Sequence, residues 1–409
     1  MDSILNKIKK YFIPAFMLVY SATAVMWVFI RIIFSNHELF GKYIYPNRLI
    51  NYRAGFIRRG LGGEIIFRLS SFFNISLVQA IDFSSAVIWI MLVMFFYKKF
   101  VQKKYPVFIL ALPFLLGETI LVDESYFLRH DSLILLIFIA MTYILTKKIF
   151  PQIVSFLLIN LLFIFGILFH EAIFFFSFPI LLLTLWHKTD SLMKSFLFFL
   201  PALVVFCLCF VVPDKSTAVE MLKLSPEINS RYIVCFASFA ENLALQWLKT
   251  SEISAFATLL YLLISVPLIY FLSINFDKFR FNIVQKKPVF QCLNCDFLSS
   301  ILILQLVSLS PLFFCALDWG RWIFLWTASS FAYFLVAEEN PFGKMPKIFL
   351  KPNLLATKLR NVSPQLVFCV AIFTGLQFGL PLKFDLWSWN MPVLIIANTV
   401  KEFLRFFTG

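Results

Sequence analysis

The fold of this chain is decided by residues 149–186, which read IFPQIVSFLLINLLFIFGILFHEAIFFFSFPILLLTLW. The stretch is too long for one membrane span, because about 20 residues suffice to cross a hydrocarbon core roughly 30 Å thick. Its only ionisable side chains, His170 and Glu171, lie near the middle. We therefore predict a tight helical hairpin with this pair at the bend. A broken helix that dips into the membrane is the alternative, since irregular backbone is tolerated where it lines a cavity.

The composition of the whole chain is typical of a membrane protein. Of its 409 residues, 61% are hydrophobic and 14% are charged, whereas soluble proteins are about 45–50% apolar. We predict an all-α fold, a single polytopic membrane helix bundle over residues 1–409 with about 11–12 transmembrane helices. The net charge of +14 comes from short basic clusters between apolar runs. These clusters favour the lipid bilayer as partner and not nucleic acid.

Lysine clusters set the predicted orientation, because basic residues favour the cytoplasmic side. Lys7, Lys9 and Lys10 place the N-terminus inside. The spans over residues 12–34 and 195–212 then lead outward, and spans such as residues 78–97 return to further basic groups on the inner side. These groups lie at residues 98–104, 147–148, 187–194, 278–287 and 344–360.

Two long outer loops follow from this topology, over residues 35–76 and 213–252. Within the first loop, apolar residues at helical spacing over residues 61–76 predict a helix that lies along the outer membrane surface. The second loop mixes both charges with aromatic residues, which would suit either a carbohydrate surface or a solvated lid.

The first outer loop contains an unusual arginine and glycine segment, residues 51–64, which reads NYRAGFIRRGLGGE. Its guanidinium groups, on Arg53, Arg58 and Arg59, offer planar donor forks that suit phosphate oxygens. We expect the neighbouring glycines to let a headgroup approach the backbone. A specific anion site is favoured here; non-specific attraction to lipid phosphates is the alternative.

Acidic and imidazole groups form a second outer cluster at residues 122–131. Here Asp123 or Asp131 could act as a base, or His130 could relay a proton. Salt bridging among the same residues, including Arg129, is the alternative. Charges beside or within spans are costly, by about 2.5–3.5 kcal/mol at a helix centre, so they tend to be paired or functional.

Two further polar pairs fall on the outer side. His170 and Glu171 are equally compatible with a catalytic pair and with a structural pair at a helix bend. Asp318 and Arg321 are three residues apart and can pair on one helix face. No spacing typical of metal ligands supports a metal site, and we predict no metal and no other cofactor.

This organisation, together with residues 53–64, resembles the Wzy-type repeat-unit polymerases of bacterial O-antigen and capsule synthesis. The resemblance implies a multi-pass enzyme of the bacterial cytoplasmic (inner) membrane that acts at the outer face on an undecaprenyl-linked oligosaccharide. Other polysaccharide-assembly membrane proteins would be its partners. Family members often carry functional arginines in two outer loops. Those roles would fall here to Arg53, Arg58, Arg59 and Arg231, although the second loop is only modestly basic.

The chain also resembles the GT-C glycosyltransferases, in which a long outer loop after the first span carries surface helices and an acidic catalytic residue. That resemblance makes Glu38 or Glu64 the candidate acid, with Asp123 and Asp131 as candidates in the next outer loop. In both families, arginines would hold the phosphate leaving group while a carboxylate or histidine deprotonates the acceptor hydroxyl. The expected phosphate-binding residues are Arg53, Arg58, Arg59, Arg129 and Arg321, and the expected catalytic residues are Asp123, His130, Asp131, His170, Glu171 and Glu64.

Two other functions remain open from the sequence. A flippase or transporter of the lipid-linked saccharide should place charged residues along a path reachable from both sides. The cytoplasmic clusters are simple lysine groups, which favours one-sided chemistry. A membrane acyltransferase that modifies the polysaccharide is the further alternative, with His130 or His170 as base.

Overall fold

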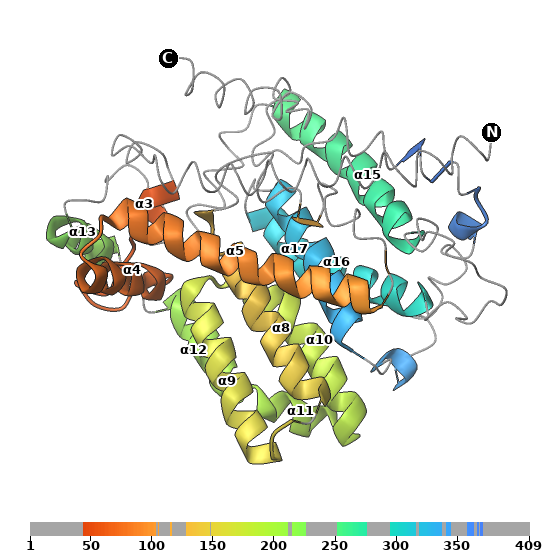
Figure 1. Ribbon diagram of the computed structural model, residues 1–409, viewed down its shortest axis with the longest axis horizontal. Coiled ribbons are helices and arrows are strands. Elements are labelled where there is room, and N and C mark those ends of the chain that lie inside the picture. Colours follow the sequence, from red (N-terminus) through yellow and green to blue (C-terminus); the bar gives the residue numbers. More distant parts are fainter. Residues whose placement is uncertain are drawn as a thin grey trace.

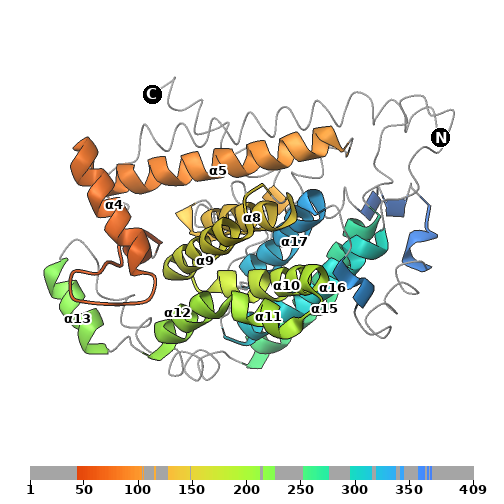
Figure 2. The same cartoon turned by 90° about the horizontal axis from the view of Figure 1, so that it is seen from below.

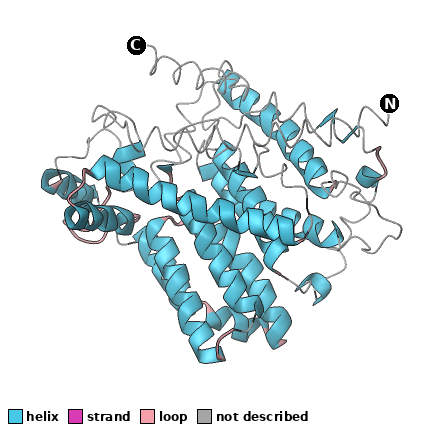
Figure 3. Cartoon of the chain, in the orientation of Figure 1, coloured by secondary structure: helices cyan, strands magenta, loops and turns pink. Residues whose placement is uncertain are grey.

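The structure is a computed structural model that describes residues 44–103, 105, 115–116, 128–147, 149–211, 215–225, 252–275, 295–315, 319–337, 341–344, 358–363, 366–367 and 369–370. Every regular element within these residues is a helix and none is a strand (Figure 3), which confirms the predicted all-α class. The predicted span over residues 12–34 lies outside the described residues, as do Glu38, Asp123, Arg231 and Asp318.

Three of the described helices are long and apolar enough to cross a membrane: α5 (Leu77–Gln102), α9 (Gln152–Phe169) and α10 (Ala172–Thr189). A fourth candidate span is formed by α11 (Leu192–Phe198) and α12 (Leu200–Val211), which are bent by 56° relative to each other. The region predicted as one span, residues 195–212, is thus divided between two helices. Pro201 explains where the second helix begins, since proline is tolerated in the first turn of a helix but not in its interior.

The hairpin predicted within residues 149–186 is confirmed. The backbone of His170 is extended, and its N–H donates the last hydrogen bond of α9 to the Gly166 carbonyl at 2.9 Å. Because both arms reach span length, the hairpin is favoured over the re-entrant alternative.

The other bundle helices are α8 (Asp131–Lys147), α15 (Glu252–Ile274), α16 (Cys295–Cys315) and α17 (Trp319–Val336). Helix α8 packs against α9, α10 and α17, and α16 packs against α10 and α17. Helix α5 lies along one side of the bundle against α8 (Figures 1 and 2).

Large apolar side chains also cover the outside of the bundle. Examples are Met94 on α5, Ile153 and Leu161 on α9, and Val204 on α12, all exposed. Soluble proteins rarely expose such faces, because apolar surface is unfavourable in water. The faces therefore agree with a membrane protein, in which lipid tails would cover them.

Lysines mark one end of the bundle. Lys103, which follows α5, donates to the Phe334 carbonyl at the end of α17 (3.4 Å), and Lys188 of α10 donates to the Leu145 carbonyl near the end of α8 (2.6 Å). These cations cover C-terminal carbonyls, where the helix dipole favours positive charge. The four helices α5, α8, α10 and α17 thus end together, and α8, α10 and α17 begin together at the opposite end.

A second apolar cluster covers that opposite end. It consists of α3 (Ile44–Arg48), α4 (Gly60–Phe73), α13 (Lys215–Leu224) and the first half of α5, and we call it the cap (Figure 1). Asn51 Nδ2 donates to Ser225 Oγ at 3.1 Å, so the two predicted outer loops contact each other. Helix α4 confirms the helix predicted over residues 61–76; its position on a membrane surface stays a prediction.

Close packing within the cap makes Gly63→Ala a destabilising substitution. A Cβ atom at Gly63 would lie 2.1 Å from the Ile50 carbonyl oxygen, which also accepts the Gly63 N–H at 3.1 Å. We expect a loss of about 1–3 kcal/mol in the free energy of unfolding, because backbone atoms cannot easily move aside. Gly166→Ala is the matched control, since its nearest atom is the flexible end of Ile173. Equal losses in denaturation in detergent would contradict this account.

Candidate functional site

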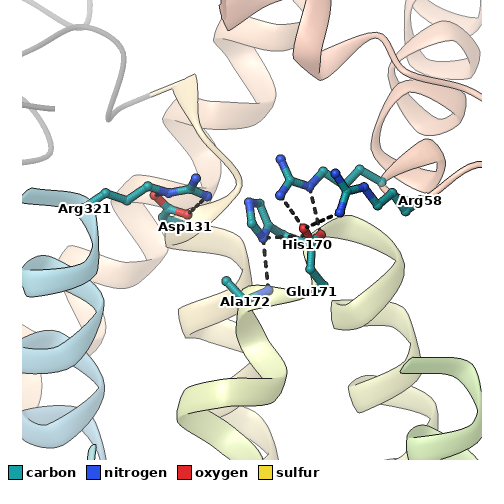
Figure 4. A network of polar contacts seen from close by, with 7 residues as sticks. Arg58, Asp131, His170, Glu171, Ala172 and Arg321 are labelled. Atoms are coloured by element: carbon teal, nitrogen blue, oxygen red, sulfur yellow. Dashed lines mark hydrogen bonds and ion pairs between the residues drawn. The ribbon is translucent and has the colours of Figure 1, made fainter. Parts of the chain in front are cut away.

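The candidate site lies where the cap meets the first residues of α8, α10 and α17. Four segments far apart in sequence contribute to it, through Arg58 and Arg59, His130 and Asp131, His170 and Glu171, and Arg321. Two ion pairs dominate the arrangement, and His170 stands between them (Figure 4).

The first ion pair joins Arg59 of the cap to Glu171 at the hairpin bend. Arg59 Nε donates to Oε2 at 2.8 Å and Nη2 donates to Oε1, while Arg58 Nη1 lies 3.6 Å from Oε1. Burial alone would raise the pKa of Glu171, but the Arg59 guanidinium and its neighbours lower that pKa well below its usual range. Glu171 is therefore an ionised carboxylate, held in place by two arginines.

The backbone of Arg59 is unusual. Its φ of 64° and ψ of 9° are left-handed, a conformation that costs energy for a residue with a side chain. Arg59 immediately precedes α4. Its conformation therefore sets the direction in which α4 begins and the direction of the Arg59 guanidinium. Such outliers persist only where surrounding contacts determine them, and they cluster at functional sites.

The second ion pair joins Asp131, the first residue of α8, to Arg321 in the first turn of α17. Arg321 Nε and Nη2 donate to the two carboxylate oxygens at 2.5 and 2.6 Å, a bidentate geometry. Asp131 is 1% exposed and Arg321 is 4% exposed. The pairing of Arg321 with Asp318 expected from their spacing stays a prediction, because Asp318 lies outside the described residues. The bidentate bond to Asp131 reaches across to another helix.

His170 is buried and is oriented by the backbone. Its Nδ1 accepts the Ala172 N–H at 3.1 Å, so the neutral imidazole carries its proton on Nε2. Burial first, and then Arg59 and Arg321, lower the pKa of His170 well below its usual value. Nε2 has no hydrogen-bond partner within the described part of the chain. His170 is thus a neutral hydrogen-bond donor, and this geometry disfavours the predicted role as a base.

His130 lies under the cap. Its ring contacts the Phe169 ring edge-on at 5.4 Å, and a Cβ atom at Gly62 would lie 2.5 Å from its Nε2. Burial first, and then Arg48, Arg59 and Arg321, lower the pKa of His130 well below its usual value. No described residue makes a hydrogen bond with its Nε2. A neutral imidazole with an unpaired nitrogen could accept a proton or a hydrogen bond.

Two of the predicted site residues lie away from this cluster. Glu64 pairs with Arg68 at 3.0 Å on an exposed face of α4. Arg53 donates to the Leu224 carbonyl at 3.2 Å and lies over the Phe67 ring, so it links the two halves of the cap. Arg129 is half-buried beside His130.

The predicted role of the glycines is corrected at three of the four positions; Gly55, whose nearest atom is Thr217 Cγ2 at 3.8 Å, is the exception. The space beside Gly60, Gly62 and Gly63 is filled by Tyr52, by His130 and by the backbone of Leu49 and Ile50, respectively. These glycines therefore allow close packing of α4 on its neighbours, and do not admit a headgroup.

Sequence reasoning missed two charged residues next to the site. Asp82 is buried on α5 and accepts the Tyr45 hydroxyl at 2.9 Å. Arg48 is buried at the end of α3. Burial lowers the pKa of Arg48 to about 10, while Asp82 and Asp131 act in the opposite direction. Asp82 had a signal in the sequence, because a lone acid within an apolar run is costly and therefore functional or paired.

Comparison of this chain with known proteins identified no related protein. No family model, no curated protein and no solved structure matches this chain. The function must therefore be inferred from the residues themselves.

The arrangement is suited to binding an anion and moving a proton. The described site contains five arginines, Arg48, Arg58, Arg59, Arg129 and Arg321, and three carboxylates, Asp82, Asp131 and Glu171. Two neutral imidazoles add hydrogen-bonding groups. Among the described residues, no group of three or more His, Cys, Asp or Glu side chains is placed to hold a metal ion.

Proposed function

We propose that this protein is a membrane glycosyltransferase, a repeat-unit polymerase or a GT-C type enzyme, of the bacterial cytoplasmic membrane. It acts at the outer face on an undecaprenyl-(pyro)phosphate-linked oligosaccharide in the assembly of surface polysaccharide. The proposal includes about 11–12 spans and a cytoplasmic N-terminus. The observation that carries it is the convergence of arginines, carboxylates and neutral histidines at one end of the bundle.

The different side chains at the two ends of the bundle support a reaction at one membrane face only. The polar cluster lies at the beginning of α8, α10 and α17, whereas Lys103 and Lys188 cover helix ends at the other side. Basic residues favour the cytoplasmic side, so the polar cluster would face outward. A flippase would instead need polar groups along a path between the two ends.

The chemistry assigns different roles to the arginines and to His130. The acceptor hydroxyl attacks the anomeric carbon of the donor sugar, and His130 takes the hydroxyl proton as the new glycosidic bond forms. The bond from the anomeric carbon to the phosphate oxygen breaks, and its electron pair leaves with the lipid phosphate. Arg58 and its neighbouring arginines stabilise the charge that develops on that oxygen.

Arg58→Ala tests the proposal without removing the main partner of Glu171, which Arg59 retains. We expect shorter surface glycans and accumulated lipid-linked intermediates in cells, because the phosphate loses a charge-assisted donor. The measurement is the glycan length distribution, with protein level checked in the same membranes. Arg68→Ala, on the exposed face of α4, is the matched control and should leave glycan length unchanged.

The intermediate that accumulates separates the alternatives. Surface lipid that bears one repeat unit indicates a polymerase, and a glycan that lacks one defined residue indicates a single-sugar transferase. Lipid-linked units that accumulate inside the cell would instead indicate a flippase. Unchanged glycan and unchanged intermediates in Arg58→Ala would rule out the phosphate role.

A further inference from the structure

The candidate site is closed to molecules outside the protein. Its central side chains are each between 1% and 6% exposed: Arg58, His130, Asp131, His170, Glu171 and Arg321. A general base must come within hydrogen-bond reach of the proton that it removes. A substrate therefore reaches the site only if part of the cover moves away.

Helix α4 lies directly over the nitrogen that the proposed reaction requires. A Cβ atom at Gly62 would lie 2.5 Å from His130 Nε2 and 3.4 Å from Phe169 Cδ1. No described residue makes a hydrogen bond with this nitrogen. The backbone of α4 thus occupies the space beside His130 Nε2, and in this conformation the proposed base is shielded from a ligand.

The ion pair between Arg59 and Glu171 joins the beginning of α4 to the beginning of α10. Arg59 immediately precedes α4, and Glu171 immediately precedes α10. Arg59 Nε donates to Oε2 at 2.8 Å and Nη2 donates to Oε1, while Arg58 Nη1 lies 3.6 Å from Oε1. Because Gly62 follows Arg59 by only three residues, breaking this ion pair releases the end of α4 that covers His130.

The backbone beside the ion pair favours a second conformation. Arg59 is left-handed, with φ of 64°, which is unfavourable for a residue with a side chain. Gly55, four residues earlier, has φ of 119°, a conformation that glycine adopts readily. Once the ion pair is broken, the Arg59 backbone can return to a common conformation, and the direction in which α4 begins would then change. The ion pair thus holds α4 against a local backbone preference.

We propose that the cap is a movable cover, that the Arg59–Glu171 ion pair keeps it closed in this structure, and that its displacement exposes His130. The inference rests on the proposed function only for the purpose of opening, because the movement itself requires no substrate. The cap has an apolar cluster separate from that of the bundle. Phe56, Leu61 and Ile65, all half-buried, pack against the bundle cluster, so displacement would leave the buried bundle residues in place.

Chemical modification of the purified full-length protein in detergent tests this inference. Diethyl pyrocarbonate acylates unprotonated imidazoles, and mass spectrometry gives the rate at each histidine. We expect slow modification of His130 in the wild type. Glu171→Gln should raise that rate by at least about tenfold, because hydrogen bonds to a charged group shift an equilibrium by about this factor. Gly62→Ala should also raise it, since the added Cβ would press α4 away from the His130 ring.

Two controls restrict the result to the cap. Glu64→Gln makes the same change at an exposed ion pair of α4, and it should leave the His130 rate unchanged. His187 lies in the last turn of α10, away from the cap, and serves as the internal reference. Because the pKa of His130 is held well below its usual value, the imidazole is neutral at pH 7 in the wild type. Loss of the Glu171 charge would lower that pKa further, so the rate reports accessibility.

Three outcomes would overturn the inference. Rapid modification of His130 in the wild type would show that the cap does not close the site. A wild-type rate in both Glu171→Gln and Gly62→Ala would show that the ion pair does not hold the cap. An equal rise at His187 would show that the whole bundle has opened. No lipid or sugar is present, so this result is separate from the proposed function: if His130→Gln left sugar transfer unchanged, that function would fail and the movable cap would stand.

Discussion

Arg321→Met is expected to lower the free energy of unfolding by about 3–5 kcal/mol, because it leaves a buried carboxylate without its counter-charge. Asp131 is 1% exposed, and both of its oxygens accept from Arg321. Methionine keeps much of the length of the side chain, so the loss reports on charge more than on volume. Chemical denaturation of the protein in mixed micelles measures the effect.

The double variant Arg321→Met with Asp131→Leu is the decisive comparison. Removing both charges should restore most of the stability, since an apolar pair of similar volume often replaces a buried ion pair without cost. Arg68→Met breaks the exposed pair with Glu64 and should cost less than about 1 kcal/mol. If the double variant is as unstable as Arg321→Met, packing rather than charge explains the loss.

His130→Gln is expected to slow sugar transfer by about 10²- to 10⁴-fold, the range typical for loss of a general base. Glutamine retains hydrogen-bonding capacity and similar bulk, so the fold should survive. His170→Gln is the matched control: the proton of the His170 ring is on Nε2, so His170 cannot accept a proton there, and the glutamine amide keeps N–H donors. The initial rate of transfer from a lipid-linked donor in membrane vesicles measures both variants.

The pH dependence checks the same assignment. Burial first, and then Arg48, Arg59 and Arg321, hold the pKa of His130 well below its usual value, so the imidazole is neutral at pH 7. A base must be neutral to act, so the transfer rate should stay constant as the pH falls from about 8 to about 6.5. A loss of rate in that interval, or a larger effect of His170→Gln than of His130→Gln, would exclude His130 as the base.

Local signals in the sequence predicted part of the fold and of the site. The bend at His170 and Glu171 was predictable because two ionisable residues interrupt a stretch too long for one span. Helix α4 was predictable from the spacing of its apolar residues. The break near Phe199 was missed, although Pro201 marked the beginning of a helix there.

The pairing of charges could not be predicted, because it depends on contacts between distant segments. Arg321 lies 190 positions from Asp131 in sequence, and Arg59 lies 112 positions from Glu171. Spacing along the chain indicates only pairs such as Asp318 and Arg321, because neighbours on one helix are the only pairs that a sequence shows directly. Arg48 was overlooked for the same reason: its lack of a carboxylate partner is a property of the packed structure.

The two ion pairs also bear on the order in which the polypeptide matures during synthesis. Arg59 emerges from the ribosome long before Glu171, and Asp131 long before Arg321. Met221, part of the apolar cluster of the cap, likewise follows α4 by well over a hundred residues. Arg59 and Asp131 therefore stay hydrated or bound to other groups until Glu171 and Arg321 have been synthesised. The polar end of the bundle closes only after α17 has been made.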